Sequence, residues 1–253
     1  MRAKQENSMT PPPLFNAHQR WILGDAPELM VAGDAALAEA SVKLHRDCWP
    51  AVYELAAAAR EAGFELRIAS GFRSFDRQLS IWNGKLDGSR ELLDDDGVTL
   101  DYRQLSVAEQ VAAVLRFSAL PGASRHHWGS DFDVYDAASL TDDYRLQLAP
   151  HEYREGGVMA AFGAWLESQL AASLDGPLAR LFDRPYSVDR GGVAIEPWHL
   201  SHRALAAELE PHCSEQLLAD RLGHCAITHA DYLAAELPAL WRRYLQPHFI
   251  GGK

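Results

Sequence analysis

Residues 124–136, with the sequence SRHHWGSDFDVYD, constrain the fold of this chain more than any other segment. Asp131 and Asp133 alternate with Phe132 and Val134, which is the period of a β-strand. In such a strand the two apolar side chains enter the core while the two aspartates face the opposite side. A carboxylate directed inward is costly unless it is paired or bound to a metal. We therefore expect the aspartates to point into a polar cleft.

Two further polar segments can approach this cleft. Gly129 lets the backbone turn sharply, so that His126 can come close to the aspartates. Further along the chain, Glu196 and His199 flank Pro197, which cannot donate a ladder hydrogen bond and so interrupts a regular central strand. Such a break would let both side chains face one cavity. Two histidines and one carboxylate as ligands, with a spare glutamate, are the components of a catalytic zinc site.

These residues resemble the zinc signature of the D-alanyl-D-alanine carboxypeptidase and dipeptidase family. That family belongs to a superfamily with the lysostaphin-type peptidases and the hedgehog signalling domain. Three motifs support the resemblance, in the expected order and within about residues 66–202: Ser70-Gly71-Phe72-Arg73-Ser74 with Gln78, Ser124-x-His126-x-x-Gly129-x-Asp131-x-Asp133, and Glu196-x-Trp198-His199.

The resemblance implies a metal site and a catalytic base. His126, Asp133 and His199 would bind one zinc ion per chain, with water in the fourth position. Glu196 would take the proton of that water and later protonate the leaving amine.

The resemblance also implies residues that bind the substrate. Arg73 would hold the substrate carbonyl or carboxylate and stabilise the oxyanion, because its fork of donors stays charged. Ser124 would help to bind the C-terminal end of the substrate, and Gln78 is also expected to bind the substrate. Asp131 stands where the family has a small residue, and it would orient a ligand, bind a substrate amine or face solvent. His127 is expected either to line the cleft or to lie on the surface.

The rest of the chain predicts an α+β fold, a small and mainly antiparallel sheet that carries the zinc site and is flanked by helices. Residues 1–14 are expected to be a flexible tail, and residues 15–253 a single peptidase domain with 202–253 as a C-terminal helical extension. The hydrophobic periodicity predicts helices over 34–63 with a kink at Pro50, over 74–85, 106–120 and 156–173, and after Ser201. It predicts strands over 64–70 and 130–135, and a strand, a turn and a second strand over 192–200.

The polar segment 86–105 is expected to be a loop. Because loops on a fixed scaffold commonly set substrate choice, the insert between Gln78 and Ser124 is predicted to form a lid or a specificity wall.

Composition excludes several classes of partner. The net charge of −11 would repel nucleic acid, and no stretch has the roughly 18 uncharged apolar residues of a membrane helix. The N-terminal residues lack the apolar core of a signal peptide, so the chain is either cytoplasmic or already trimmed. Three cysteines, Cys48, Cys213 and Cys225, are too few for a disulfide framework. We expect a cytoplasmic protein; no pattern indicates an oligomeric state.

Other polar clusters are weaker candidates for a metal site. His151-Glu152 lacks the second histidine of a zinc helix and lies beside Pro150, which favours a loop. The His212-Cys213 and His224-Cys225 pairs match no compact zinc spacing and are expected on helical surfaces. The run of aspartates at 94–96 is expected to be a solvated turn.

The function that the resemblance implies is removal of a C-terminal D-alanine from peptidoglycan-derived peptides. In a cytoplasmic enzyme we favour L,D-carboxypeptidase activity on recycled tetrapeptides, because trimming of D-Ala-D-Ala ends would damage cell-wall precursors. The alternatives are a D,D-carboxypeptidase or dipeptidase, an endopeptidase of the stem peptide, or a non-catalytic binding module that retains zinc.

Overall fold

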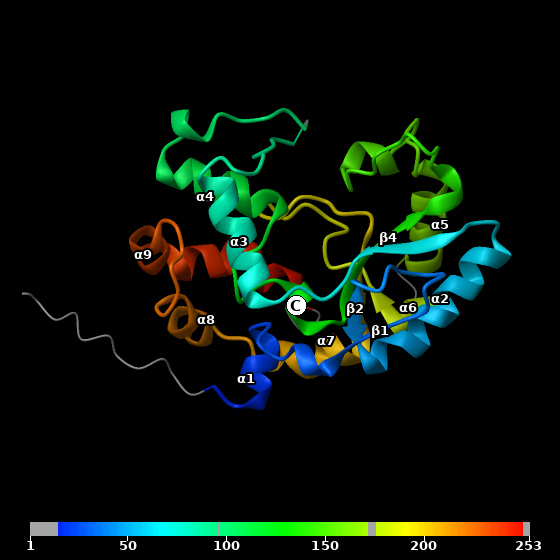
Figure 1. Cartoon of the computed structure of the whole chain (residues 1–253), viewed down its shortest axis with the longest axis horizontal. Coiled ribbons are helices and arrows are strands. Elements are labelled where there is room, and N and C mark those ends of the chain that lie inside the picture. The colour runs from blue at the N-terminus through cyan, green and yellow to red at the C-terminus, as the bar shows by residue number, and fades with distance from the viewer. Residues whose placement is uncertain (1–14, 96, 172–175, 250–253) are drawn as a thin grey trace, which may run out of the picture.

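The computed structural model, which describes residues 15–95, 97–171 and 176–249, contains a four-stranded antiparallel sheet (Figure 1). The strand order is β3-β4-β6-β5, and a separate two-stranded sheet pairs β1 with β2. The strands are β1 (Met30–Ala32), β2 (Lys43–His45), β3 (Leu66–Ser70), β4 (Asp131–Asp136), β5 (Phe182–Asp183) and β6 (His199–His202). The α+β prediction is confirmed, and the predicted tail 1–14 lies outside the described residues.

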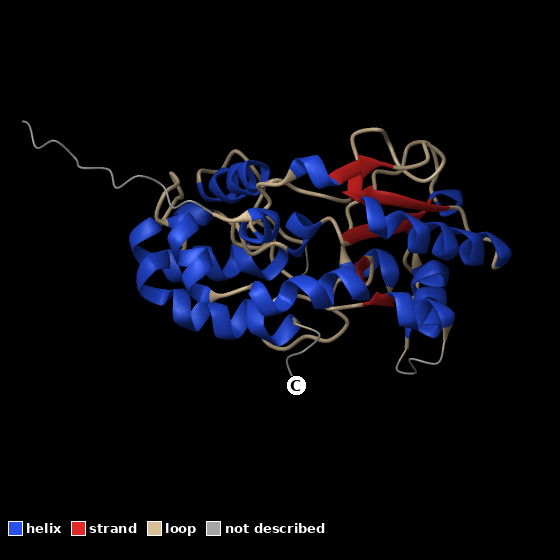
Figure 2. Cartoon of the chain, turned by 90° about the horizontal axis from the view of Figure 1, so that it is seen from below, coloured by secondary structure: helices blue, strands red, loops and turns tan. Residues whose placement is uncertain are grey.

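The described residues form nine α-helices, most of which belong to two groups (Figures 1 and 2). They are α1 (Ala17–Ile22), α2 (Trp49–Glu61), α3 (Phe75–Leu86), α4 (Val107–Phe117), α5 (Ala160–Leu170), α6 (Pro177–Leu181), α7 (Arg203–Leu209), α8 (Glu215–Leu222) and α9 (Ala230–Leu240). Helices α2, α5 and α6 lie beside the sheet, whereas α3, α4, α8 and α9 group together at the other end of the molecule. No helix in these parts of the chain is long and apolar enough to cross a membrane.

Two apolar clusters stabilise the two groups of elements. Phe132 and Val134 of β4 are fully buried and belong to one cluster with Leu55 of α2. The second cluster holds Trp82 of α3 and Leu115 of α4 together with residues of α8 and α9. Burial of apolar surface contributes roughly 25 cal/mol per Å². Each group therefore has its own source of stability.

Strand β4 follows the predicted alternation. Phe132 and Val134 enter the core, while Asp131 and Asp133 lie on the other face. Strand β4 pairs with β3 on one side and with β6 on the other, and Asp133 lies opposite His199 in the register. The central position of β4 explains why both aspartates are buried.

The predicted helix over 34–63 is wrong in its first half. Helix α2 begins only at Trp49, with Pro50 in its first turn, and strand β2 occupies Lys43–His45. Proline lacks an N–H group, and the first turn of a helix leaves its N–H groups unbonded in any case. Pro50 therefore fits the first turn of the helix instead of kinking it.

The predicted strand, turn and strand over 192–200 is also wrong in its first half. Only β6, which begins at His199, forms a strand there. The N–H of Ala194 donates to the carbonyl of Arg116, and the N–H of Glu196 to the carbonyl of Tyr186. These contacts hold the segment as an irregular loop.

The other predicted elements are present. Strand β3 corresponds to 64–70, and α3 and α4 correspond to 74–85 and 106–120, with Ser74 and Ser106 as their N-caps. Helix α5 (Ala160–Leu170) lies within the predicted range 156–173, whose last two residues lie outside the described residues.

Replacement of Gly129 tests whether the tight turn before β4 requires a residue without a Cβ atom. Gly129 has φ +70°, and an added Cβ would lie 2.3 Å from the sulfur of Met30 and 2.8 Å from the nitrogen of His45. Gly63 has φ +89° and no atom within 4 Å of such a Cβ, so Gly63→Ala is the matched control. Both variants should lose about 1–2 kcal/mol of unfolding free energy through the left-handed backbone. Gly129→Ala should lose about 1–3 kcal/mol more through overpacking. Chemical denaturation measures the difference, and equal losses would contradict the predicted clash.

Candidate metal site

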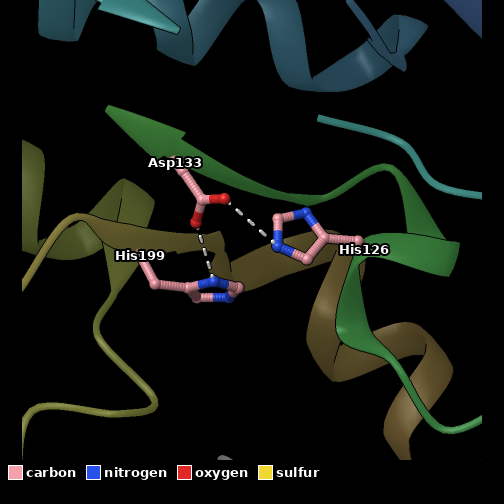
Figure 3. A group of neighbouring side chains, drawn as sticks. All are labelled: His126, Asp133 and His199. Atoms are coloured by element: carbon pink, nitrogen blue, oxygen red, sulfur yellow. Dashed lines mark hydrogen bonds and ion pairs between the residues drawn. The ribbon is translucent and has the colours of Figure 1, made fainter. Parts of the chain in front are cut away.

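His126, Asp133 and His199 come together in one buried group (Figure 3). One ligand atom from each lies within 4.8 Å of those of the other two. Asp133 lies between the two imidazoles, at 3.5 Å from Nε2 of His126 and 3.2 Å from Nδ1 of His199. The residues come from the 3₁₀ turn Arg125–Trp128, from β4 and from β6. The structure thus unites the three residues that the resemblance indicates as ligands.

A backbone carbonyl orients His126. Its Nδ1 lies 2.9 Å from the carbonyl oxygen of Gly71, which can only accept a hydrogen bond. The proton is therefore on Nδ1, and Nε2 presents its lone pair toward Asp133. A metal-binding histidine commonly donates its other N–H in this way.

Asp131 orients His199. The Nε2 of His199 lies 3.0 Å from Oδ1 of Asp131, so that Nδ1 faces Asp133. The other oxygen of Asp131 accepts hydrogen bonds from the hydroxyls of Ser130 and Ser201. Of the three roles considered for Asp131, its contacts match the orientation of a ligand. Asp131 is fully buried and does not line the cavity described below.

Arg125 is the counter-charge of Asp131, and the sequence motifs did not identify it. Its guanidinium donates to Asp131 at 2.7 Å, to Glu210 at 2.8 Å and to the carbonyl of His248 at 3.2 Å. It is 3% exposed and lies over the ring of Trp128, 4.5 Å from the ring centroid. Only the fold brings Glu210 and His248 to Arg125, so no local pattern could indicate this network.

The pKa values of His126 and His199 are shifted in opposite directions. Burial lowers the pKa of His126 to about 4, so its ring is neutral at pH 7. Burial also lowers the pKa of His199, but hydrogen bonds to Asp131 and Asp133 outweigh it and raise the pKa to about 9. In the metal-free protein a proton on His199 thus offsets part of the negative charge of the two carboxylates.

This donor set fits a zinc ion. Imidazole nitrogens and a carboxylate oxygen are ordinary zinc ligands, and three protein ligands are typical of a catalytic zinc site. A divalent cation would replace the proton of His199 as the charge that balances Asp133. Within the described residues this is the one group of three ligand side chains with such spacing, and the His-Cys pairs near 212 and 224 form none.

Glu196 lies beside the three ligands. Its Oε2 is 3.5 Å from Nδ1 of His199, and its side chain is 14% exposed. Burial raises the pKa of Glu196 to about 7. A carboxyl group in this position can exchange a proton with a molecule in the cavity.

Arg73 is held in place by side chains of its own motif. It donates to the amide oxygen of Gln78 at 2.9 Å and to the hydroxyl of Ser70 at 3.4 Å. Gln78 in turn donates to the hydroxyl of Ser118 and to the carbonyl of Ala119. Gln78 is fully buried and does not line the cavity, so its observed contacts are with Arg73 and the protein.

A cavity of about 340 Å³ opens onto these groups. Arg73, Ser124, Glu196 and the three ligands line it. Its outer walls come from the loop residues Glu91, Leu93, Asp94, Asp95 and Gly97, from 147–151, and from Tyr244, Leu245, His248 and Phe249 near the C-terminus. The insert between Gln78 and Ser124 thus contributes to the wall of the cavity, and its role as a lid or a specificity wall stays a prediction. The contribution of the C-terminal residues was not predicted.

His127 has neither of the two predicted positions. It is fully buried and does not line the cavity. Its Nε2 accepts from the N–H of Gly122, and its Nδ1 lies 2.5 Å from the carbonyl oxygen of Arg73. His127 therefore fixes the backbone of Arg73.

Comparison with known proteins assigns the chain to a family and finds proteins of similar sequence. A family model described as D-alanyl-D-alanine carboxypeptidase matches residues 41–205. Two uncharacterized proteins of Haemophilus influenzae are similar in sequence. One is 48% identical over 62 residues, which cover 24% of this chain and 42% of that protein. The other is 31% identical over 126 residues, which cover 50% of this chain and 92% of that protein.

Two solved structures of low sequence identity are similar to the chain. One is VanYB in complex with D-alanine-D-alanine, at 19% identity and a TM-score of 0.46, covering 78% of this chain and 90% of that chain. The other is a mutant of the vancomycin resistance D,D-pentapeptidase VanY in complex with Zn(II), at 21% identity and a TM-score of 0.46, covering 76% and 91%.

Asp131→Asn tests whether Asp131 supports metal binding through His199. The amide keeps the size of the side chain but removes the charge that polarises the imidazole. We expect affinity for Zn²⁺ to fall by about 10-fold to 100-fold, measured by competition with a chelator. Asp136→Asn is the matched control, because Asp136 is buried on the same strand but its carboxylate accepts hydrogen bonds from Glu65, Ala138 and Ser139, which lie outside the metal site. Equal affinities in both variants would contradict the role of Asp131.

Proposed function

This chain belongs to the D-alanyl-D-alanine carboxypeptidase family, and on that premise we propose that it is a zinc-dependent carboxypeptidase acting on peptidoglycan-derived peptides. The proposal rests on one observation above all. The ligand atoms of His126, Asp133 and His199 lie within 4.8 Å of one another, beside Glu196 and at the wall of a cavity.

The three ligands would hold one zinc ion, as the donor set and the Zn(II) complex of a VanY protein suggest. When bound, zinc supplies a Lewis acid that polarises a carbonyl and makes water more acidic. The hydrogen bonds of His126 to Gly71 and of His199 to Asp131 keep the two lone pairs directed at the ion. Asp131 thus acts through His199 and does not itself touch the substrate.

Glu196 would move the protons of the reaction. It lies next to the ligands without being needed as one, so its carboxylate is free to accept a proton from the attacking water. The same group then delivers that proton to the amine of the departing D-alanine.

Arg73 would bind the scissile carbonyl or the substrate carboxylate and offset developing negative charge. Gln78 and Ser70 restrain its guanidinium, so little side-chain freedom is lost when the substrate binds. Ser124, which is 2% exposed and lines the cavity, would contact the C-terminal end of the substrate.

The finer specificity that we propose is L,D-carboxypeptidase activity on tetrapeptides during cell-wall recycling in the cytoplasm. The three cysteines, which form no disulfide, support a reducing compartment. In that compartment, removal of D-alanine from D-Ala-D-Ala ends would destroy wall precursors. The alternatives are D,D-carboxypeptidase or dipeptidase activity and cleavage within the stem peptide.

Mass spectrometry of muropeptide digests tests this specificity. The zinc-loaded protein should release D-alanine from a tetrapeptide stem. Release from a pentapeptide stem alone would refute the L,D assignment, and internal fragments would identify an endopeptidase.

Glu196→Gln tests whether the chain is an enzyme or a binding module. The variant keeps the volume of the side chain but cannot accept the proton, so kcat should fall by about 100-fold to 10,000-fold. Zinc content should stay near one ion per chain, measured by elemental analysis. Glu208→Gln is the control, because the side chain of Glu208 is 54% exposed. A non-catalytic module requires neither Glu196 nor Arg73, and it is favoured if the unmodified zinc-loaded protein cleaves none of these peptides.

A further inference from the structure

Lys85 is a cationic group of the cavity wall that the proposed reaction does not use. It lies on α3, is half-buried, and lines the cavity together with Arg73 and Glu196. Among the described residues, the ammonium group of Lys85 forms neither a hydrogen bond nor an ion pair. A partly desolvated cation without a partner is unfavourable, and such a group commonly meets its partner in a bound molecule.

The position of Lys85 on α3 directs its side chain toward the reaction centre. Lys85 and Gln78 are seven residues apart, so they lie on the same face of the helix, about 10 Å apart along its axis. Side chains of a helix lean toward its N-terminus, and therefore the Lys85 side chain leans toward Gln78 and the guanidinium that Gln78 holds. Burial and the positive charges of Arg73 and Arg90 lower the pKa of Lys85, whereas the charge of Glu196 raises it.

The acidic groups of the same cavity do not neutralise Lys85. Asp95 accepts two hydrogen bonds from Arg116, both at 2.7 Å, and Asp94 accepts one from the N–H of Val98 at 2.8 Å. Glu91 is exposed and forms no ion pair with Lys85 among the described residues. Lys85 therefore has no ion-pair partner among the described residues of the wall, although Glu196 and Asp133 line the same cavity.

We propose that Lys85 forms a second anion subsite of the cavity, which binds a carboxylate of the peptide substrate. The inference rests on the proposed function and adds a substrate feature to it. Arg73 lies close to Glu196 and serves the scissile carbonyl, and Lys85 of α3 is a further cation that lines the same cavity.

Two carboxylates of a peptide lie near enough to a scissile bond to reach this subsite. One is the C-terminal carboxylate of the departing residue. The other is a side-chain carboxylate on the residue before it. A peptide residue spans about 3.3–3.6 Å, so either group lies within a few residue lengths of the reacting carbonyl. Recognition of the first would favour cleavage at a chain end, whereas recognition of the second would select the residue before the D-alanine.

Binding measurements with three peptides test the proposal and identify the source of the carboxylate. The parent peptide ends in D-alanine after a residue with a side-chain carboxylate. In the second peptide the side-chain carboxylate is a carboxamide, and in the third the C-terminal carboxylate is a carboxamide. Titration calorimetry gives each Kd for zinc-loaded Glu196→Gln, which is expected to bind without cleaving. The same titrations are made after the additional change Lys85→Met.

A charge-assisted contact predicts that Lys85→Met raises the Kd of the parent peptide by about 10-fold to 100-fold. One amidated peptide should bind weakly to both proteins and show no further loss with Lys85→Met, and that peptide identifies the carboxylate. Lys85→Arg should retain most of the affinity. Lys43→Met is the matched control, because Lys43 is exposed and does not line the cavity, and it should change no Kd by more than about 2-fold.

The proposal is overturned if Lys85→Met weakens all three peptides equally or none of them. It is also overturned if neither amidation weakens binding to the protein with Lys85 intact, a measurement that does not depend on the folding of any Lys85 variant. Failure of this proposal can be distinguished from failure of the proposed function. Cleavage is assayed on the unmodified protein, whereas binding is measured on the Glu196→Gln protein without cleavage.

Discussion

Two carboxylates, Asp131 and Asp133, are buried on the same face of one strand, and the rest of the site depends on how their charges are balanced. Each loses its hydration, and the two repel each other in an interior of low dielectric constant. The fold supplies two different counter-charges. Arg125 donates to Asp131, whereas Asp133 lies between the imidazoles of His126 and His199. The protein therefore neutralises one carboxylate by itself and leaves the other available to a metal ion.

This division of charge makes residues near the C-terminus part of the site. Arg125 also donates hydrogen bonds to Glu210 and to the carbonyl of His248. Tyr244 and Phe249 line the same cavity as the ligands. These residues therefore support His199 of β6 through Arg125 and also shape the space in which a peptide would bind. Changes in this part of the chain would act on both properties together.

Cationic side chains line the cavity of a chain that is acidic as a whole. The net charge is −11, yet Arg73 and Lys85 line the same wall, and α3 carries both Lys85 and Gln78, which holds Arg73. At physiological salt, exposed charges are screened over roughly 8 Å, whereas partly buried ones are screened much less. Cations inside a cavity can therefore attract a carboxylate even though the outer surface is acidic.

The sequence by itself determined the features that depend on neighbouring residues. The alternation of Phe132 and Val134 with the aspartates predicted β4, and Ser74 and Ser106 predicted the starts of α3 and α4. The motif residues indicated the ligands as well. Helix propensity gave the wrong prediction for residues 34–48. There β2 pairs with β1, and this strand pairing prevailed over the local preference for a helix. Only the tertiary structure decided the partners of Arg125 and the walls of the cavity. Those contacts join segments up to 123 residues apart, and their energy exists only once the chain has folded.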